Sequence, residues 1–403
     1  MHHDGWPLPE SVDYVLRSTA SAGRAIFARR NIKPGTHILS TTEKYEQLRS
    51  PTVHVILRPY RREVCAQCFA YDRGREWKCR LPDAGVAFCS VECRQQWESV
   101  IGPLGLAAHQ AIETTIKKQS KWKKTTQDST PMTTAVDSPD LDFDAAWQAA
   151  GVVGKQIVAA RTKEKPSKTE QRYLREAESA PADPDFLAYL LSGVLVTHKR
   201  SAAPAMVGKD ADEPSDESSI PGTDMVSELF PDLMALASDS SVYTGDSPLS
   251  SWTKAYKLLL AILPIPLLDF LRPAICHELA SRASHNAFSI RPAGGSDGEQ
   301  SGEFLGWGVW PEASFFNHSC RPNVRKERVG RIWTFAVSED ITGDVLREGE
   351  ELCITYLGGD EKDLDVEERR KKLKGEWGFD CQCQKCVEEL HDLPLSAILH
   401  ERS

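Results

Sequence analysis

The chain of 403 residues carries a formal net charge of −9, with 40% hydrophobic and 27% charged residues. This length and composition allow a soluble globular protein with a substantial core. The acidic balance argues against a surface built for nucleic acid and suits basic, lysine-rich protein partners. The longest uncharged apolar run of the second half, Leu258–Leu268, is interrupted by two prolines and is too short to cross a bilayer, and the start lacks a secretory pattern. We therefore expect no membrane partner and a location in the nucleus and/or the cytoplasm.

Short strands and turns are predicted for the N-terminal part of the chain. Ala25–Ala28 is a short apolar run of the kind that forms a strand. The tight turn Pro34-Gly35 precedes a second such run at Thr36–Leu39.

The middle of the chain is expected to be irregular between two helical regions. Gln95–His109 predicts a short helix with a Gly-Pro interruption. Gly208–Ser240 carries nine acidic residues against one lysine, which is typical of a mobile insert, with a short amphipathic piece at Val226–Leu236. Helical periodicity returns at Ser251–Arg282, as two helices separated by a Pro-Ile-Pro break. A basic cluster at 117–124 is either a nuclear signal or solvated surface.

Short strands follow residue 286 and are succeeded by a charged helix. In that helix Glu367 precedes Lys371, and Glu368 precedes Lys372, in the favourable i,i+4 order. The pattern of apolar residues predicts four strands before it. These are Ala287–Ile290, Phe304–Trp310, Ile332–Val337 and Glu351–Tyr356.

The clustering of the cysteines favours metal binding. Eleven cysteines in a chain without a secretory signal are expected to be reduced or metal-bound. Cys381, Cys383 and Cys386 supply three ligands of a tetrahedral zinc site. Cys320, in the compact motif Asn-His-Ser-Cys, is a strong candidate for the fourth. The alternative is a set of unrelated free thiols, which this density of cysteines disfavours.

A second zinc site is predicted nearer the N-terminus. Two close pairs of cysteines, separated by a loop, can chelate one zinc ion from two sides. Cys79 and His109 remain as possible halves of a further site. Two ligands cannot close such a site, so a lone buried cysteine and a surface histidine are the simpler interpretation there. The paired ligands are Cys65, Cys68, Cys89 and Cys93.

A third constellation joins the segment around Asn317 to the segment that ends at Tyr356. Read alone, an Asn-His pair can be a buried polar pair, and a tyrosine at the end of a strand usually packs. Together with the cysteines that follow, these segments make the chain closely resemble SET-domain lysine methyltransferases of the SET-and-MYND group. The matching pieces, in family order, are Gly23-Arg24 with the following strand, Ile32–Gly35, Asn286–Ile290, Asn317–Cys320, Glu351–Tyr356 and Phe379–Cys386.

The resemblance implies S-adenosylmethionine as the cofactor, structural zinc, and a target lysine of a protein as the substrate. Tyr356 would be the catalytic residue that closes the lysine channel, and Phe379 would stack on the adenine of the cofactor. The C-terminal zinc would be the post-SET zinc of the family, with Cys320 as its fourth ligand. The residues implied in cofactor binding are Arg24, Ala25, Asn286, Asn317, His318, Tyr356 and Phe379.

The implied fold is α+β: small twisted SET-domain sheets with a knot-like threading, an inserted MYND-type zinc finger, a helical insert and the post-SET zinc site. The finger would recruit a proline-rich peptide. The chain would be a short form without the C-terminal helical domain of larger relatives. The predicted divisions are 8–48 for the N-terminal SET part, 63–109 for the finger, 110–250 for a variable, partly disordered insert, 251–375 for the helical insert and SET core, 376–390 for the post-SET segment and 391–403 for a tail.

Three departures from the family pattern leave a rival function open. Ala25 stands where the family has the second glycine of its first cofactor loop, and Trp377 replaces a second channel tyrosine. The finger also lacks two cysteines of its second zinc site. The first function is a protein-lysine N-methyltransferase acting on a histone or non-histone protein. The rival is a catalytically weak scaffold that acts as a protein-binding adaptor.

Overall fold

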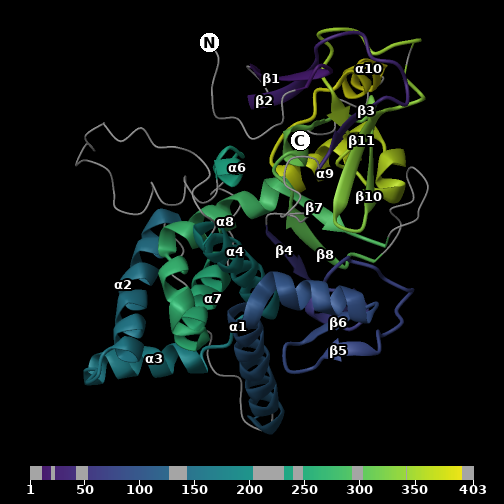
Figure 1. Ribbon diagram of the computed structural model, residues 1–403. Coiled ribbons are helices and arrows are strands. Elements are labelled where there is room, and N and C mark those ends of the chain that lie inside the picture. The colour runs from purple at the N-terminus through teal and green to yellow at the C-terminus, as the bar shows by residue number, and fades with distance from the viewer. Residues whose placement is uncertain are drawn as a thin grey trace, which may run out of the picture. The chain divides into compact units, whose positions relative to one another are not determined.

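The computed structural model divides into two compact units (Figure 1). The first unit comprises Met1–Pro51, Arg291–Phe304 and Trp310–Ser403, and the second comprises Thr52–Ile290 and Leu305–Val309. The first unit therefore combines the two ends of the chain. The described residues are 11–19, 23–41, 53–126, 143–202, 231–238, 248–292, 303–341 and 343–392.

Helices dominate the second unit. α7 (Pro248–Ile262), the 3-10 helix η3 (Ile265–Phe270) and α8 (Pro273–Asn286) follow one another along the chain. Proline cannot donate the hydrogen bond that continues a helix, so Pro264 and Pro266 separate the two long helices. The two helices predicted for Ser251–Arg282 are confirmed.

Three further helices lie in 110–250, the segment predicted to be a variable and partly disordered insert. They are α2 (Phe143–Thr162), α3 (Lys168–Ser179) and α4 (Pro184–Ala202). α2 and α3 pack against α7 within the second unit. The predicted acidic insert lies outside the described residues except for 231–238, which include the short α6 (Pro231–Met234).

A local signal explains where α3 begins, and a glycine allows α2 to pack closely on α7. Ser167 and Glu170 make a reciprocal capping box at the start of α3, with the Ser167 hydroxyl accepting from the Glu170 amide at 3.2 Å. A Cβ atom at Gly154 would lie 2.4 Å from the Tyr256 hydroxyl. α2 therefore approaches α7 at a point where a larger residue would force a shift.

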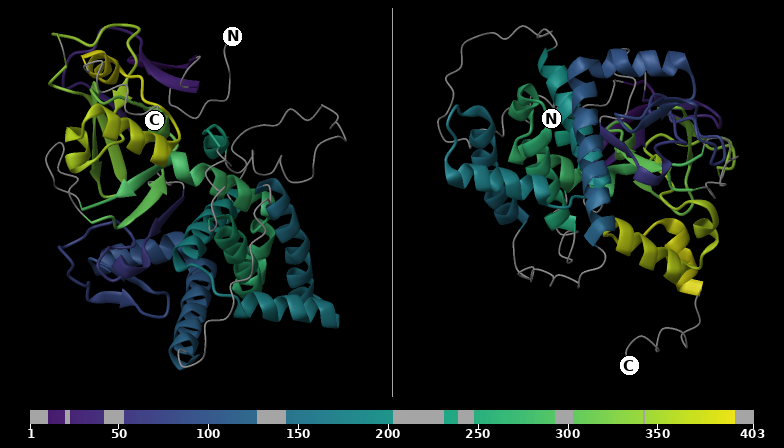
Figure 2. Two further views of the ribbon diagram at one scale, coloured as in Figure 1. Left: turned by 180° about the vertical axis from the view of Figure 1, so that it is seen from behind. Right: turned by 90° about the horizontal axis from the view of Figure 1, so that it is seen from below.

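The cysteine-rich part of the second unit is a hairpin followed by a bent helix. β5 (Cys79–Leu81) pairs with β6 (Val86–Phe88), and α1 (Val91–Thr126) follows. Gly102 has φ 66° and ψ 179° inside α1, so the two arms of the helix meet at a sharp bend (Figure 2). The predicted interruption of this helix is confirmed.

A three-stranded antiparallel sheet completes the second unit. Its order is β4 (Val53–Ile56), β8 (Gly306–Val309) and β7 (Ala287–Ile290), and the 3-10 helix η1 (Arg58–Tyr60) follows β4. β7 and β8 lie inside two of the predicted strands. β4 was not predicted.

The first unit is built from small sheets. β1 (Tyr14–Thr19) pairs with β2 (Gly23–Ala28) in antiparallel fashion. A second, antiparallel sheet has the order β10 (Val324–Val329), β11 (Ile332–Val337) and β3 (His37–Ser40). These short strands confirm the mixed α+β class predicted from the sequence.

The two motif segments of the first unit lie side by side. β9 (Asn317–His318) pairs in parallel with β12 (Cys353–Ile354). The Asn323 side chain fixes this crossing, because it donates to the Glu351 carbonyl and accepts from the Cys353 amide, both at 2.8 Å. The predicted knot-like threading would lie at this crossing.

The C-terminal part of the first unit is helical. η4 (Ala313–Phe315) and η5 (Gly359–Asp363) are short 3-10 helices, and α9 (Val366–Trp377) and α10 (Gln384–Asp392) follow. α9 is the predicted charged helix, although Lys372 contacts Glu361 and Glu376 rather than Glu368. The 391–403 tail lies outside the described residues beyond residue 392.

Among the described residues, every helix is too short or too polar to span a bilayer.

Candidate active site and metal centres

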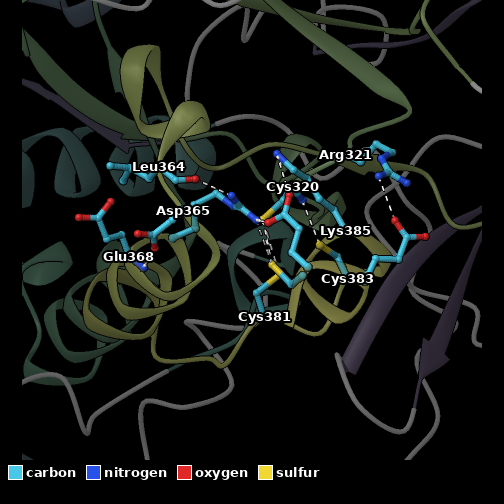
Figure 3. A network of polar contacts seen from close by, with 12 residues as sticks. Cys320, Arg321, Leu364, Asp365, Glu368, Cys381, Cys383 and Lys385 are labelled. Atoms are coloured by element: carbon cyan, nitrogen blue, oxygen red, sulfur yellow. Dashed lines mark hydrogen bonds and ion pairs between the residues drawn. The ribbon is translucent and has the colours of Figure 1, made fainter. Parts of the chain in front are cut away.

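Four cysteines of the first unit come together near α10, and Figure 3 labels three of them, Cys320, Cys381 and Cys383. Cys381 and Cys383 precede α10, Cys386 lies in its first turn, and Cys320 follows β9. The four Sγ atoms lie within 4.8 Å of one another. The Cys320 Sγ is 3.5 Å from that of Cys386 and 4.0 Å from that of Cys381. Zinc with bonds of about 2.3 Å to four sulfurs separates them by about 3.8 Å, so this C-terminal sulfur group fits a structural zinc ion.

The sulfurs of this group compete for protons. Hydrogen bonds from Cys320 and Cys381 lower the pKa of the Cys383 thiol. The hydrogen bond with Cys320 raises the pKa of Cys381. A divalent cation would replace the protons and remove the competition, since metal binding requires thiolates.

The four other predicted ligands form a second group, in the second unit. Cys65 and Cys68 precede β5, Cys89 follows β6, and Cys93 lies in the first turn of α1. Their Sγ atoms also lie within 4.8 Å of one another. The Cys89 Sγ is 3.6 Å from that of Cys68 and 3.5 Å from that of Cys93. The hydrogen bond with Cys68 lowers the pKa of Cys65 to about 5. This finger sulfur group also fits one zinc ion.

Cys79 and His109 do not join either group. Among the residues that the structure describes, the clusters of metal-binding side chains are these two sets of four cysteines. The His109 ring packs 5.1 Å from the ring of Trp97. Burial, with a smaller contribution from Arg61, lowers the pKa of His109 to about 4. His109 is thus a partly buried, neutral side chain rather than the surface histidine that the sequence suggested.

Aromatic side chains enclose Tyr356 in the first unit. Its ring centroid lies 5.6 Å from that of Trp377, 6.3 Å from that of Phe379 and 5.3 Å from that of His318. The Tyr356 hydroxyl donates to the Phe316 carbonyl at 2.9 Å. Burial, followed by the nearby Cys353 and Glu351, raises the pKa of Tyr356. The tyrosine is therefore protonated at physiological pH, with its hydroxyl held in one direction.

Both ring nitrogens of His318 have partners within the first unit. Nδ1 accepts from the Tyr356 amide at 2.9 Å, and Nε2 lies 3.2 Å from the Cys320 Sγ. The accepting Nδ1 assigns the hydrogen to Nε2, which donates to the sulfur. Burial lowers the pKa of His318 to about 4, so the ring is neutral. Any contact of His318 with a cofactor is thus left to its main chain, and its side chain links Tyr356 to the sulfur group.

Asn317 has a carboxylate partner that was not singled out from the sequence. Its Nδ2 donates to the Glu351 Oε1 at 2.8 Å and to the Arg24 carbonyl at 3.4 Å. These bonds orient the amide so that its Oδ1 points away from both partners. Glu351 begins one motif segment, and Asn323 lies three residues after the other. The sequence alone did not predict which atoms these two side chains would contact.

Arg24 and Ala25 lie in the regular strand β2. The Arg24 guanidinium lies over the Phe315 ring, 5.3 Å from its centroid. Ala25 is fully buried opposite Arg17 of β1. Gly23, at φ +70°, provides the left-handed residue that precedes them. The extra methyl group of Ala25 is therefore accommodated in the packed strand.

Asn286 belongs to the second unit, whereas the six other predicted cofactor residues belong to the first. It is the last residue of α8 and is buried. Its Nδ2 donates to the Ala237 carbonyl at 2.8 Å and to the Arg282 carbonyl at 3.0 Å. These contacts fix the start of β7 within the second unit.

A partly buried lysine of β10 bonds the residue before Tyr356. The Lys326 Nζ donates to the carbonyl of Thr355, the preceding residue, at 2.7 Å. Burial lowers the pKa of Lys326 to about 8, with Lys362 and Arg291 acting in the same direction. Lys326 lies in β10, where exposed and less exposed side chains alternate. Nothing in that pattern marked it as the lysine that would bond the Thr355 carbonyl.

Comparison with known proteins decides the family. The SET domain matches residues 23–357, which include the finger and both motif segments. The chain belongs to the SET-domain family. The fold of this chain is therefore that of the S-adenosylmethionine-dependent protein-lysine methyltransferases, with four-cysteine groups near each end.

Individual relatives agree with this family. The chain is 24% identical over 418 residues to the "potential protein lysine methyltransferase SET6" of Saccharomyces cerevisiae, which covers 94% of this chain and 96% of the relative. It is 42% identical over 112 residues to a SET and MYND domain-containing protein of Dictyostelium discoideum, covering 27% of this chain and 19% of that protein. The "histone-lysine N-methyltransferase ASHR2" of Arabidopsis thaliana is 28% identical over 159 residues, covering 38% of this chain and 37% of the relative.

Proposed function

We propose that this protein is a protein-lysine N-methyltransferase that transfers a methyl group from S-adenosylmethionine to a lysine side chain of a histone or non-histone protein. The observation that carries the proposal is the aromatic enclosure of Tyr356 by Trp377 and Phe379, with the hydroxyl bound to the Phe316 carbonyl. Similarity along nearly the whole chain to a potential protein lysine methyltransferase supports it.

The enclosure suits the nucleophile. Methyl transfer needs a neutral amine, whereas a free lysine has a pKa of about 10.4. Aromatic walls keep water from the ammonium form and lower that pKa. In this scheme Trp377 supplies the wall without the hydroxyl of a second tyrosine. Positioning of the amine in line with the departing sulfur then provides about 7–11 kcal/mol of the acceleration.

The Tyr356 hydroxyl is set up to accept a contact from the reacting groups. Because the hydroxyl donates its proton to the Phe316 carbonyl, its oxygen lone pairs point away from that carbonyl and can accept a contact. Its raised pKa keeps it neutral. The role of Tyr356 is thus to orient the lysine and the transferred methyl group rather than to exchange a proton.

The residues around Asn317 fit the amino-acid end of the cofactor. The Nδ2 of Asn317 is occupied by Glu351 and Arg24, so its Oδ1 is directed to accept from the cofactor's ammonium group. Phe379, whose ring is 6.1 Å from that of His318, would stack on the adenine, and the His318 main chain would bond it. When bound, S-adenosylmethionine supplies the methyl group as a sulfonium.

Zinc would be structural in both sulfur groups. In the C-terminal group it would tie Cys320, three residues after Asn317, to the tail that follows Phe379. The finger group fits a MYND-type finger with one zinc ion, for which a proline-rich peptide is the proposed partner. The match to a SET and MYND domain-containing protein supports this assignment.

Transfer of a labelled methyl group tests the proposed activity. Zinc-loaded protein would be incubated with labelled S-adenosylmethionine and with core histones or a fractionated protein extract. We expect label on lysine with the wild type, and a loss of about 10²-fold or more with Tyr356→Phe, the size typical of removing one preorganised polar contact to the transition state. Binding of the cofactor without transfer to any fraction would favour the adaptor.

A further inference from the structure

Arg369 of α9 carries a charge into the interior of the first unit. Its side chain is 3% exposed. A buried guanidinium is destabilising unless its charge and its hydrogen-bond donors are matched by partners. The partners of Arg369 therefore show what this residue is placed to do.

The guanidinium reaches two separate parts of the unit, the segment before α9 and the helix α10. Nη1 donates to the Leu364 carbonyl before α9 at 2.5 Å. Nη2 contacts the Glu389 carboxylate of α10 and lies 3.9 Å from the Cys386 Sγ. One sulfur of the C-terminal group, that of Cys386, thus lies against the guanidinium.

The charges explain this arrangement. Four thiolates around one zinc ion carry a net charge of −2, and a nearby cation offsets part of it. Glu389 is 38% exposed, so water screens its charge more than that of the enclosed sulfurs. An ion pair with Glu389 alone would not require the contact with the Cys386 sulfur.

We propose that Arg369 is a positioning residue of the C-terminal metal centre, where it donates to the metal-bound thiolate of Cys386. This inference rests on zinc occupancy of that group, which is part of the proposed function. Arg369 also fixes α9 to the metal centre, and α9 ends at Trp377, beside Tyr356. The arginine therefore couples the metal centre to the wall of the proposed lysine channel.

A matched control exists in the same region. Arg321 pairs with Glu388, the neighbour of Glu389, but both side chains are about half exposed, at 54% and 45%. An exposed ion pair contributes about 0–1 kcal/mol. Arg321→Gln thus removes an arginine–α10 pair without removing a buried charge from the sulfurs.

The test measures metal retention in the full chain. Each variant is loaded with zinc, and release of the two equivalents to a coloured chelator is followed. Loss of a partner of metal ligands typically weakens metal binding by about 10–100-fold. We expect that loss for one equivalent in Arg369→Gln, a smaller loss in Arg369→Lys, which keeps the charge but not the fork, and no change beyond twofold in Arg321→Gln. The finger equivalent serves as the internal reference.

Cobalt substitution separates this role from a merely structural one. Removing a positive donor from a thiolate raises the energy of the sulfur electrons, so the sulfur-to-cobalt absorption should shift to longer wavelength in Arg369→Gln. If that variant does not fold, Glu389→Gln tests the same role through a shift in the opposite direction. Without the carboxylate charge, Arg369 should interact more strongly with the sulfur and shift the absorption band to shorter wavelength.

Two results would overturn the inference, and they differ. Unchanged retention and an unchanged cobalt band in folded Arg369→Gln, or an unshifted band in Glu389→Gln, would reduce Arg369 to a structural ion pair. A folded wild type that retains no metal in the C-terminal group would remove the metal centre itself.

Discussion

The two sulfur groups have similar internal geometry and different connections. The finger group takes its four cysteines from one short stretch, Cys65–Cys93, and packs against Phe88 and Trp97 nearby. The C-terminal group takes Cys320 from 61 residues before Cys381. Its sulfurs contact His318 and Arg369, which lead to Tyr356 and to α9.

This difference indicates different consequences of metal binding. A zinc ion in the finger group would stabilise a local hairpin and the start of a helix. A zinc ion in the C-terminal group would hold together chain segments that carry Asn317, Tyr356 and Phe379. The same four-cysteine chemistry would thus serve a docking module in one place and the proposed active site in the other.

The largest expected effect comes from removing one ligand of each group. Cys386→Ser should lose one zinc equivalent and weaken S-adenosylmethionine binding by about 100-fold or more, because structural zinc contributes about 10–16 kcal/mol of folding free energy in small zinc domains. Cys93→Ser should lose the other equivalent and change cofactor affinity by less than about threefold. Zinc content and calorimetric titration measure both. Equal losses of cofactor binding in the two variants would contradict the comparison.

Glu351 allows a sharper test within the first unit. Glu351→Gln should weaken S-adenosylmethionine binding by about tenfold, since a hydrogen bond to a charged group is worth about 1.5–3 kcal/mol, while both zinc equivalents are retained. The adjacent Glu350 is exposed, so Glu350→Gln is the matched control. Loss of zinc from Glu351→Gln would mean that this carboxylate supports the fold rather than the orientation of Asn317.

The lowered pKa of Lys326 predicts that the stability of the first unit depends on pH. Its pKa is lowered to about 8 in the folded chain, so between pH 8 and the ordinary lysine pKa of about 10.4 the unfolded chain binds more protons. Stability then rises with pH in this window. Lys326→Met should remove about 2 kcal/mol of that rise, measured by urea unfolding at several pH values. The exposed Lys371→Met is the control, and an equal slope in wild type and Lys326→Met would refute the assignment.

The smallest effect is expected at the two finger residues outside the sulfur group. Cys79→Ser and His109→Phe should each leave the zinc content unchanged, because neither side chain lies in a metal-binding cluster. His109→Phe should change stability by about 1 kcal/mol or less, since it keeps an aromatic ring against Trp97. Loss of a zinc equivalent in either variant would mean that the residue binds a second zinc ion in the finger.

The sequence predicted what depends on local pattern and on residue chemistry. Both sets of four cysteines, the break between α7 and α8, and the bend of α1 at Gly102 follow from spacing or from proline and glycine. Helices α2 and α3 were missed because polar residues dominate their surroundings in the sequence and concealed their buried faces. Contacts across long separations were also missed. The bonds of His318 to Tyr356 and of Arg369 to Cys386 depend on tertiary packing that no local motif encodes.

The central claim is that the first unit holds S-adenosylmethionine beside Tyr356. Calorimetric titration of the cofactor into folded, zinc-loaded protein tests it most directly, with wild type, Asn317→Ala and Tyr356→Phe compared. The account predicts binding by wild type and Tyr356→Phe and its loss in Asn317→Ala. Absence of binding by the wild type would contradict the account.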